Sequence, residues 1–132
     1  MKIISAVICA ALGGAAFAQS REMGEPPPTQ DPVQWAEQVS SHAMKQCRDK
    51  RLHGELTTYA ASVQCSNKVM IAAFSKAHYK YMDLIQNFAA KRLALASMVD
   101  RGALTDEQAE LAMNKALDAI QESAHQRDSG AK

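Results

Sequence analysis

The chain has 132 residues, of which 47% are hydrophobic and 22% are charged. This length is enough for one modest core and too short for most multi-domain enzymes, and the composition is that of a globular protein rather than a disordered one. The net charge is +1. Because Lys2 lies in a segment that we expect to be removed, the mature chain is balanced in charge, which argues against a nucleic-acid partner.

Residues 1–18 have the three parts of a secretory signal peptide. Lys2 supplies the positive start, residues 3–12 are mostly apolar, and Ala16-Phe17-Ala18 forms a small-x-small cleavage site. The apolar run is too short to span the roughly 30 Å hydrocarbon core of a bilayer. We therefore expect cleavage before Gln19 and a mature protein in the bacterial periplasm or outside the cell, with no transmembrane segment left after cleavage.

Export determines how the cysteines are interpreted. Cys9 leaves with the signal peptide, so the mature chain keeps Cys47 and Cys65. Two thiols in an oxidising compartment usually pair, and the spacing of these two matches no redox, haem-attachment or zinc motif. We expect a structural disulfide between them, which stabilises by about 3 kcal/mol in the chain-entropy model.

The segment that follows the signal peptide differs in composition from the rest of the chain. Residues 19–30 are polar and contain the run Pro26-Pro27-Pro28, which favours an extended backbone. These features predict a disordered, proline-rich tether.

The remaining sequence predicts an all-α domain over residues 31–127. Proline is absent after Pro32, alanine is abundant, and β-branched residues are sparse. We predict a small three- or four-helix bundle with a disordered tail at 128–132. The glycines at 54 and 102 are expected at helix ends, since glycine takes the left-handed cap conformation cheaply.

The first two predicted helices flank Gly54. The first begins with Asp31 as its cap and Pro32 at the first helical position, and it ends at Gly54. A short second helix is predicted over residues 56–65, with Ser66-Asn67 as its stop.

A long central helix is predicted from about Lys68 to Asp100. His78 and Arg92 fall on its apolar stripe. Unbroken, this helix would be about 50 Å long, roughly twice what a compact domain of this size needs, so it has to bend or project. The apolar stripe recurs at spacings of mostly three and four and comprises Ile71, Phe74, Tyr81, Ile85, Phe88, Leu95 and Val99.

The last helix is predicted to begin at Thr105. In Leu104-Thr105-Asp106-Glu107-Gln108 the threonine can cap the helix and the glutamine can complete a capping box. The same five residues resemble the LTxxQ element of small helical periplasmic stress chaperones of the Spy and CpxP type, which implies a chaperone-like role; the second copy that such proteins carry is missing, since residues 56–60 read LTTYA. The predicted core stripe of this helix consists of Ala109, Met113, Ala116, Leu117, Ile120 and Ala124.

Basic residues are concentrated in two stretches although the total charge balances. One interpretation is that the acidic last helix neutralises them. The other is that they form a groove for an anionic envelope ligand, such as a polymer or a lipid head group. The candidate anion-binding residues are Lys45, Arg48, Lys50, Arg51, Lys76 and Lys80.

His78 and Met82 stand four apart on the predicted long helix and would share one face. Such a soft pair suits copper or axial haem ligation, whereas the simpler interpretation makes His78 a hydrogen-bonded core residue and Met82 a gap filler. On the simpler interpretation no metal or cofactor is expected.

Enzyme signatures such as GxSxG, HExxH, a P-loop or the two ExxH motifs of a di-iron bundle are lacking. We therefore predict a non-enzymatic binding or interaction protein of the bacterial cell envelope, whose partner is a protein or an anionic ligand. The alternative is a metal- or haem-binding helical bundle that uses His78 and Met82.

Overall fold

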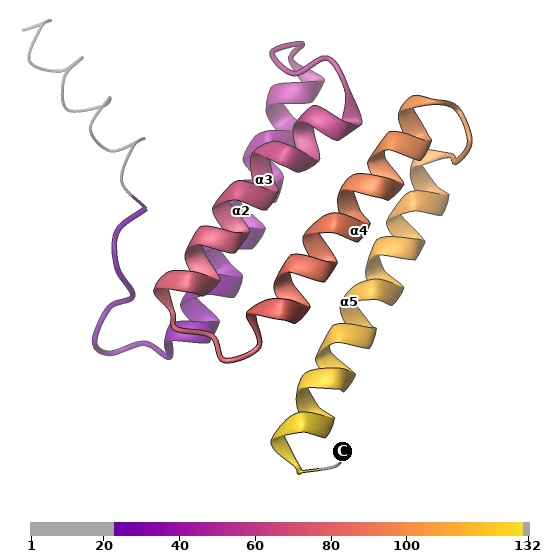
Figure 1. Cartoon of the computed structure of the whole chain (residues 1–132). Helices are drawn as coiled ribbons and strands as arrows, with labels where there is room; N and C mark the ends of the chain where they lie inside the picture. Colours follow the sequence, from indigo (N-terminus) through magenta and orange to yellow (C-terminus); the bar gives the residue numbers. More distant parts are fainter. Residues whose placement is uncertain (1–22, 131–132) are drawn as a thin grey trace, which may run out of the picture.

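The structure is a computed structural model that describes residues 23–130, so the predicted signal peptide lies outside it. Within that range the chain forms four α-helices and no strand. The helices are α2 (Pro32–Leu52), α3 (Tyr59–Lys76), α4 (Met82–Asp100) and α5 (Asp106–Asp128). They run alternately up and down (Figure 1). The prediction of an all-α domain of three or four helices is confirmed, and none of these helices is long and apolar enough to cross a membrane.

Each helix packs against its neighbours in the sequence, and the bundle is open because the first and last helices do not meet. α3 packs against α2 and α4, and α4 packs against α5, whereas in the described part of the chain no Cα atom of α2 lies within 8 Å of one in α5. A closed up-and-down bundle would bring its first and last helices together. Figure 1 shows the resulting arrangement, with the pair α2–α3 on one side and the pair α4–α5 on the other.

The α2–α3 hairpin is joined by small side chains and by the disulfide. The predicted Cys47–Cys65 bond is confirmed, with a Cα–Cα distance of 5.9 Å. Next to it, the Ser62 hydroxyl of α3 donates a hydrogen bond to the Cys47 carbonyl, 3.2 Å away. The buried stripe of α2 repeats at spacings of three and four and includes Ala36, Ser40, Ala43 and Cys47, which are small enough to let the two helices approach closely.

The helix ends predicted at Asp31, Gly54 and Thr105 are confirmed. The Asp31 carboxylate accepts a hydrogen bond from the Gln34 amide at 2.9 Å, and Gly54 follows α2 with a φ of +81°. At the start of α5, the Thr105 hydroxyl accepts from the Gln108 amide, and the Gln108 side chain accepts from the Thr105 amide. The residues that resemble the LTxxQ element thus form a capping box.

Two predictions are wrong: the short helix over residues 56–65 and the single long helix over residues 68–100. Ser66 and Asn67, expected to stop a helix, are buried in the middle of α3. The chain breaks instead after Lys76, so that two helices of ordinary length replace the long central one.

The break between α3 and α4 is a Schellman motif with histidine in place of glycine. His78 has a φ of 53°, and it is the single non-glycine residue with a positive φ between residues 23 and 130. The His78 amide donates to the Ser75 carbonyl and the Tyr79 amide donates to the Phe74 carbonyl, each at 3.0 Å. The rings of Tyr79 and Phe74 then meet edge to face, 5.3 Å apart, which supplies the apolar contact of this motif.

One core cluster connects all four helices, and α5 contributes least to it. The only buried residues of α5 are Ala109 and Ala116, so the predicted core stripe of this helix is only partly covered. The cluster consists of Trp35, Ala36, Met70, Ala73, Phe74, Ala77, Ile85, Phe88, Ala89 and Ala116.

Residues 23–30 precede α2 without forming a helix. Met23 packs against the core cluster, and the Gly24 carbonyl accepts a hydrogen bond from the Lys76 ammonium group at 3.0 Å. Residues 19–22 of the predicted tether lie outside the described range.

Candidate functional site: an open groove between the first and last helices

An apolar groove of about 640 Å³ lies between α2 and α5. Its volume falls within the roughly 300–1,000 Å³ range of small-molecule sites. Met70 and Phe74 of α3 contribute to its floor together with Ile85, Phe88 and Arg92 of α4. The apolar wall residues are Val33 and Met44 from α2 and Met113, Leu117, Ile120 and Ala124 from α5.

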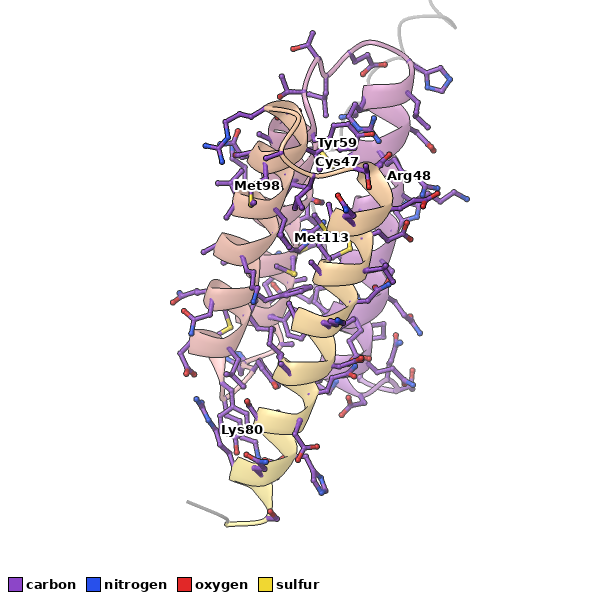
Figure 2. All side chains as sticks on the ribbon, turned by 90° about the vertical axis from the view of Figure 1, so that its right-hand side faces the viewer. Cys47, Arg48, Tyr59, Lys80, Met98 and Met113 are labelled. Carbon is purple, nitrogen blue, oxygen red and sulfur yellow. A yellow bond between two sulfur atoms is a disulfide. The ribbon has the colours of Figure 1, made fainter. Side chains whose placement is uncertain are left out.

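The wall that α5 provides is an amphipathic stripe that neither α2 nor α3 covers. Met113, Leu117, Ile120 and Ala124 are four, three and four residues apart, so they share one face of the helix. Since α2 does not reach α5, Leu117 keeps 39% of its surface exposed. Figure 2 views the molecule with α5 in front and marks Met113 on the upper part of this wall.

Polar contacts hold α5 in place at both of its ends. At its start, Asp106 accepts a short hydrogen bond from the Tyr59 hydroxyl of α3. At its end, Asp128 accepts from the Tyr81 hydroxyl at 2.7 Å and pairs with Lys80. These contacts fix the helix at the ends of the groove, whereas Leu117 in its middle turns stays partly exposed.

A second ion pair at the same end joins α5 to α4. The Arg127 guanidinium donates two hydrogen bonds to the Asp83 carboxylate, at 2.9 and 2.8 Å. Arg127 lowers the pKa of Asp83, and hydrogen bonds from Lys80 and Tyr81 lower the pKa of Asp128. Both carboxylates are therefore ionised at neutral pH.

Arg92 is a buried cation on the floor of the groove. Its side chain lines the groove, although only 7% of the residue is exposed. The guanidinium donates to the Asn67 carbonyl oxygen at 2.6 Å and to the Ser66 hydroxyl at 3.1 Å. Burial lowers its pKa to about 10, so it is still positively charged at neutral pH.

The partners of Arg92 are all neutral. The Asn67 side chain in turn donates a hydrogen bond to the Ala89 carbonyl at 2.8 Å, and the Ser66 hydroxyl donates to the Val63 carbonyl at 3.2 Å. None of the ion pairs found in residues 23–130 includes Arg92. Its charge is thus hydrogen-bonded but not balanced by a carboxylate. Burying a cation without a counter-charge lowers the stability of the folded protein.

Carboxylates lie on the rim of the groove rather than on its floor. Glu37 of α2 and Glu110 of α5 line it and are exposed, as is Asp128, which is paired with Lys80. Arg92 is the single lysine or arginine among the lining residues. The site therefore combines an apolar floor, one buried positive charge and an acidic rim.

The six candidate anion-binding residues do not form one patch. Lys45, Arg48, Lys50 and Arg51 lie on the last turns of α2, whereas Lys76 and Lys80 lie at the opposite end of the domain, near the α3–α4 connection; Figure 2 shows Arg48 and Lys80 far apart. Several are engaged elsewhere. Lys76 is 3.7 Å from Glu25, Lys80 pairs with Asp128, and Arg51 stacks 3.8 Å from the ring centroid of Tyr59.

The geometry expected for His78 and Met82 is also not formed. His78 lies exposed in the connection and Met82 is the first residue of α4, so no single helix carries both. His78 therefore does not interrupt a core stripe. The part of the chain that the structure describes holds no group of three or more His, Cys, Asp or Glu side chains placed to bind a metal ion.

The sequence did not predict the groove, but it singled out Arg92, one of the lining residues. Arg92 stood out as a charge on an apolar stripe, which is the signal that could have marked it as a site residue. No known protein family, curated protein or solved structure matches this chain. The function is therefore inferred from the geometry of the site itself.

Proposed function

We propose that this protein is an exported, non-enzymatic binding protein of the bacterial cell envelope and that it holds an apolar small molecule in the groove between α2 and α5. The observation that carries this proposal is the apolar stripe of α5, which faces an apolar floor and is covered by no other helix of residues 23–130. Apolar concavities lined by a few placed polar groups are the usual form of small-molecule sites.

The shape of the groove favours an extended ligand. Its wall on α5 runs from Glu110 to Asp128, which corresponds to about 27 Å along the helix. Long apolar side chains from all four helices line it, and five of them are methionine or phenylalanine: Met44, Met70, Phe74, Phe88 and Met113. A flexible alkyl chain can follow such a surface, and methionine adapts to its contour.

Two features support export. The Cys47–Cys65 disulfide is typical of an oxidising compartment, and the sequence begins with a stretch that has the parts of a signal peptide. The charge of the predicted mature chain is balanced, so we propose no nucleic-acid partner.

The test uses the disulfide-bonded mature chain and the uncharged fluorophore N-phenyl-1-naphthylamine. We expect saturable binding with an increase in fluorescence. Leu117→Gln should weaken binding about fivefold, because it replaces part of the apolar wall while keeping a residue that forms helices well. Leu111→Gln is the matched control, since Leu111 is on the same helix, is 63% exposed and does not line the groove.

Two results would overturn this proposal. One is the absence of saturable binding, or a loss that is equal in both variants. The other is a stable dimer of the chain that binds no fluorophore and dissociates in Leu117→Gln, which would show that a second copy covers the groove.

A further inference from the structure

We infer that the ligand of this groove is a long-chain carboxylate and that Arg92 binds its negatively charged head group. This inference rests on the proposed function, since it specifies the chemistry of the molecule that the groove holds. It concerns the floor of the groove, whereas the proposed function rests on its apolar walls.

The first reason is that the charge of Arg92 lacks a balancing anion. Its known partners, Asn67 and Ser66, are neutral, and they use two of the five N–H donors that a guanidinium has. A planar guanidinium matches a carboxylate with two parallel hydrogen bonds. A ligand carboxylate in the groove would supply the negative charge that residues 23–130 do not place next to Arg92.

The second reason is the order of residues along the floor. Arg92 follows Phe88 by one turn, and Ile85 lies about one turn before Phe88, so apolar and charged side chains succeed one another on one face of α4. The lining residues of α4 from Arg92 to Ile85 span about 10 Å, and Tyr79 of the α3–α4 connection also lines the groove. A head group at Arg92 therefore leaves an apolar track for an alkyl chain toward the α3–α4 connection.

The third reason is that no lysine or arginine other than Arg92 lines the groove. Glu37 and Glu110 lie exposed on the rim, and Arg92 is the single permanent cation among the lining residues. A preference for an anionic ligand would thus have to come from Arg92. A preference for a cationic ligand would instead point to the rim carboxylates.

The experiment compares three ligands with the same chain: dodecanoate, dodecanol and dodecylammonium. Each displaces N-phenyl-1-naphthylamine from the disulfide-bonded mature protein at pH 7, below the concentration at which micelles form. We expect dodecanoate to bind about tenfold more tightly than dodecanol, as hydrogen bonds to charged groups allow, and dodecylammonium to bind most weakly.

The outcomes separate this inference from the proposed function. Equal binding of dodecanoate and dodecanol, or tighter binding of dodecylammonium, would overturn the role of Arg92 while leaving the groove as an apolar binding site. Failure of all three ligands and of the fluorophore would overturn both.

Two variants test the residue itself. Arg92→Gln removes the charge and should bring the ratio of the dodecanoate and dodecanol affinities to about one, while Arg92→Lys keeps the charge and should retain part of the preference. A preference that persists in Arg92→Gln would show that another group binds the carboxylate. If Arg92→Gln does not fold, Arg92→Lys and the ranking in the unaltered protein still decide the question.

Discussion

The two helical hairpins of this domain are built in different ways. In the α2–α3 hairpin a disulfide and a stripe of small buried side chains join the helices, and α3 alone buries Ser62, Val63, Ser66, Asn67, Met70, Ala73 and Phe74. In the α4–α5 hairpin no cross-link is present, and α5 buries only Ala109 and Ala116. Although α5 is the longest of the four helices, it is the one most weakly attached to the core.

This difference explains why the groove exists. Among the described helices, only α4 has Cα atoms within 8 Å of those of α5, and the ends of α5 are held by polar contacts from Tyr59, Tyr81 and Asp83. Such contacts fix the position of a helix without burying its apolar stripe. The domain thus has a well-buried floor of α3 and α4, a cross-linked wall on one side and a weakly buried wall on the other.

The largest effect is expected where the two hairpins meet. Phe88 of α4 is 7% exposed and belongs to the core cluster with Phe74 of α3. Phe88→Ala should lower the free energy of unfolding by about 3–5 kcal/mol, because it removes a large apolar group and leaves a cavity. Chemical denaturation measures this, with the exposed Leu52→Ala as the control; equal losses in both variants would contradict the packing described here.

Removal of the disulfide should have the next largest effect. The bond closes a loop across 18 residues, and its loss should lower the free energy of unfolding by about 3 kcal/mol. The double variant Cys47→Ala with Cys65→Ala and the reduced protein should agree in denaturation experiments. If hydrogen exchange showed that α5 rather than α2–α3 opens after reduction, the assignment of the cross-link to the stability of the first hairpin would be wrong.

Much of this fold was predictable because local rules act at the helix ends. Asp31, Gly54 and the Thr105 capping box each satisfy free backbone groups with nearby residues, so their signals are visible in the sequence. The break at His78 escaped prediction because the same backbone conformation is taken there without glycine. The contact between Tyr79 and Phe74 that accompanies it belongs to the folded motif, and it has no signature in the apolar periodicity.

The site was less predictable than the fold. Periodicity correctly placed Met113, Leu117 and Ile120 on one face of the last helix, but it cannot tell whether another helix covers that face. The face stays uncovered because α2 and α5 do not meet. Whether two helices meet depends on how the whole domain packs and cannot be read from either segment. The basic residues Lys76 and Lys80 were grouped with those of α2 by sequence, whereas the fold places them at the other end.

A smaller effect is expected at the start of α5. Thr105→Ala removes the hydroxyl that accepts from the Gln108 amide, and such losses typically cost about 1 kcal/mol. Because α5 is weakly buried, we expect faster hydrogen exchange within α5 and little change in α2 and α3. Thr58→Ala, which removes the corresponding cap of α3, serves as the comparison. Equal exchange changes throughout the domain in both variants would show that the two hairpins open as one unit.

The smallest effect concerns acid and the last turn of α5. The pKa values of Asp83 and Asp128 are lowered in the folded protein by Arg127, and by Lys80 and Tyr81, respectively. As the pH falls, these carboxylates are therefore protonated at a higher pH in the unfolded chain than in the folded protein. The ion pairs contribute stability that is fully present above about pH 4 and is lost as the pH falls through the lowered folded-state pKa values. Because both carboxylates are exposed and screened by solvent, the loss should be modest and confined to the end of the helix.

Backbone amide NMR between pH 5 and pH 2 should show the last turn of α5 fraying while the amides of α3 stay unchanged, and Asp83→Asn should reduce the size of that transition. A transition of α3 at the same pH, or one that Asp83→Asn leaves unaltered, would mean that these ion pairs do not attach α5 to the rest of the domain.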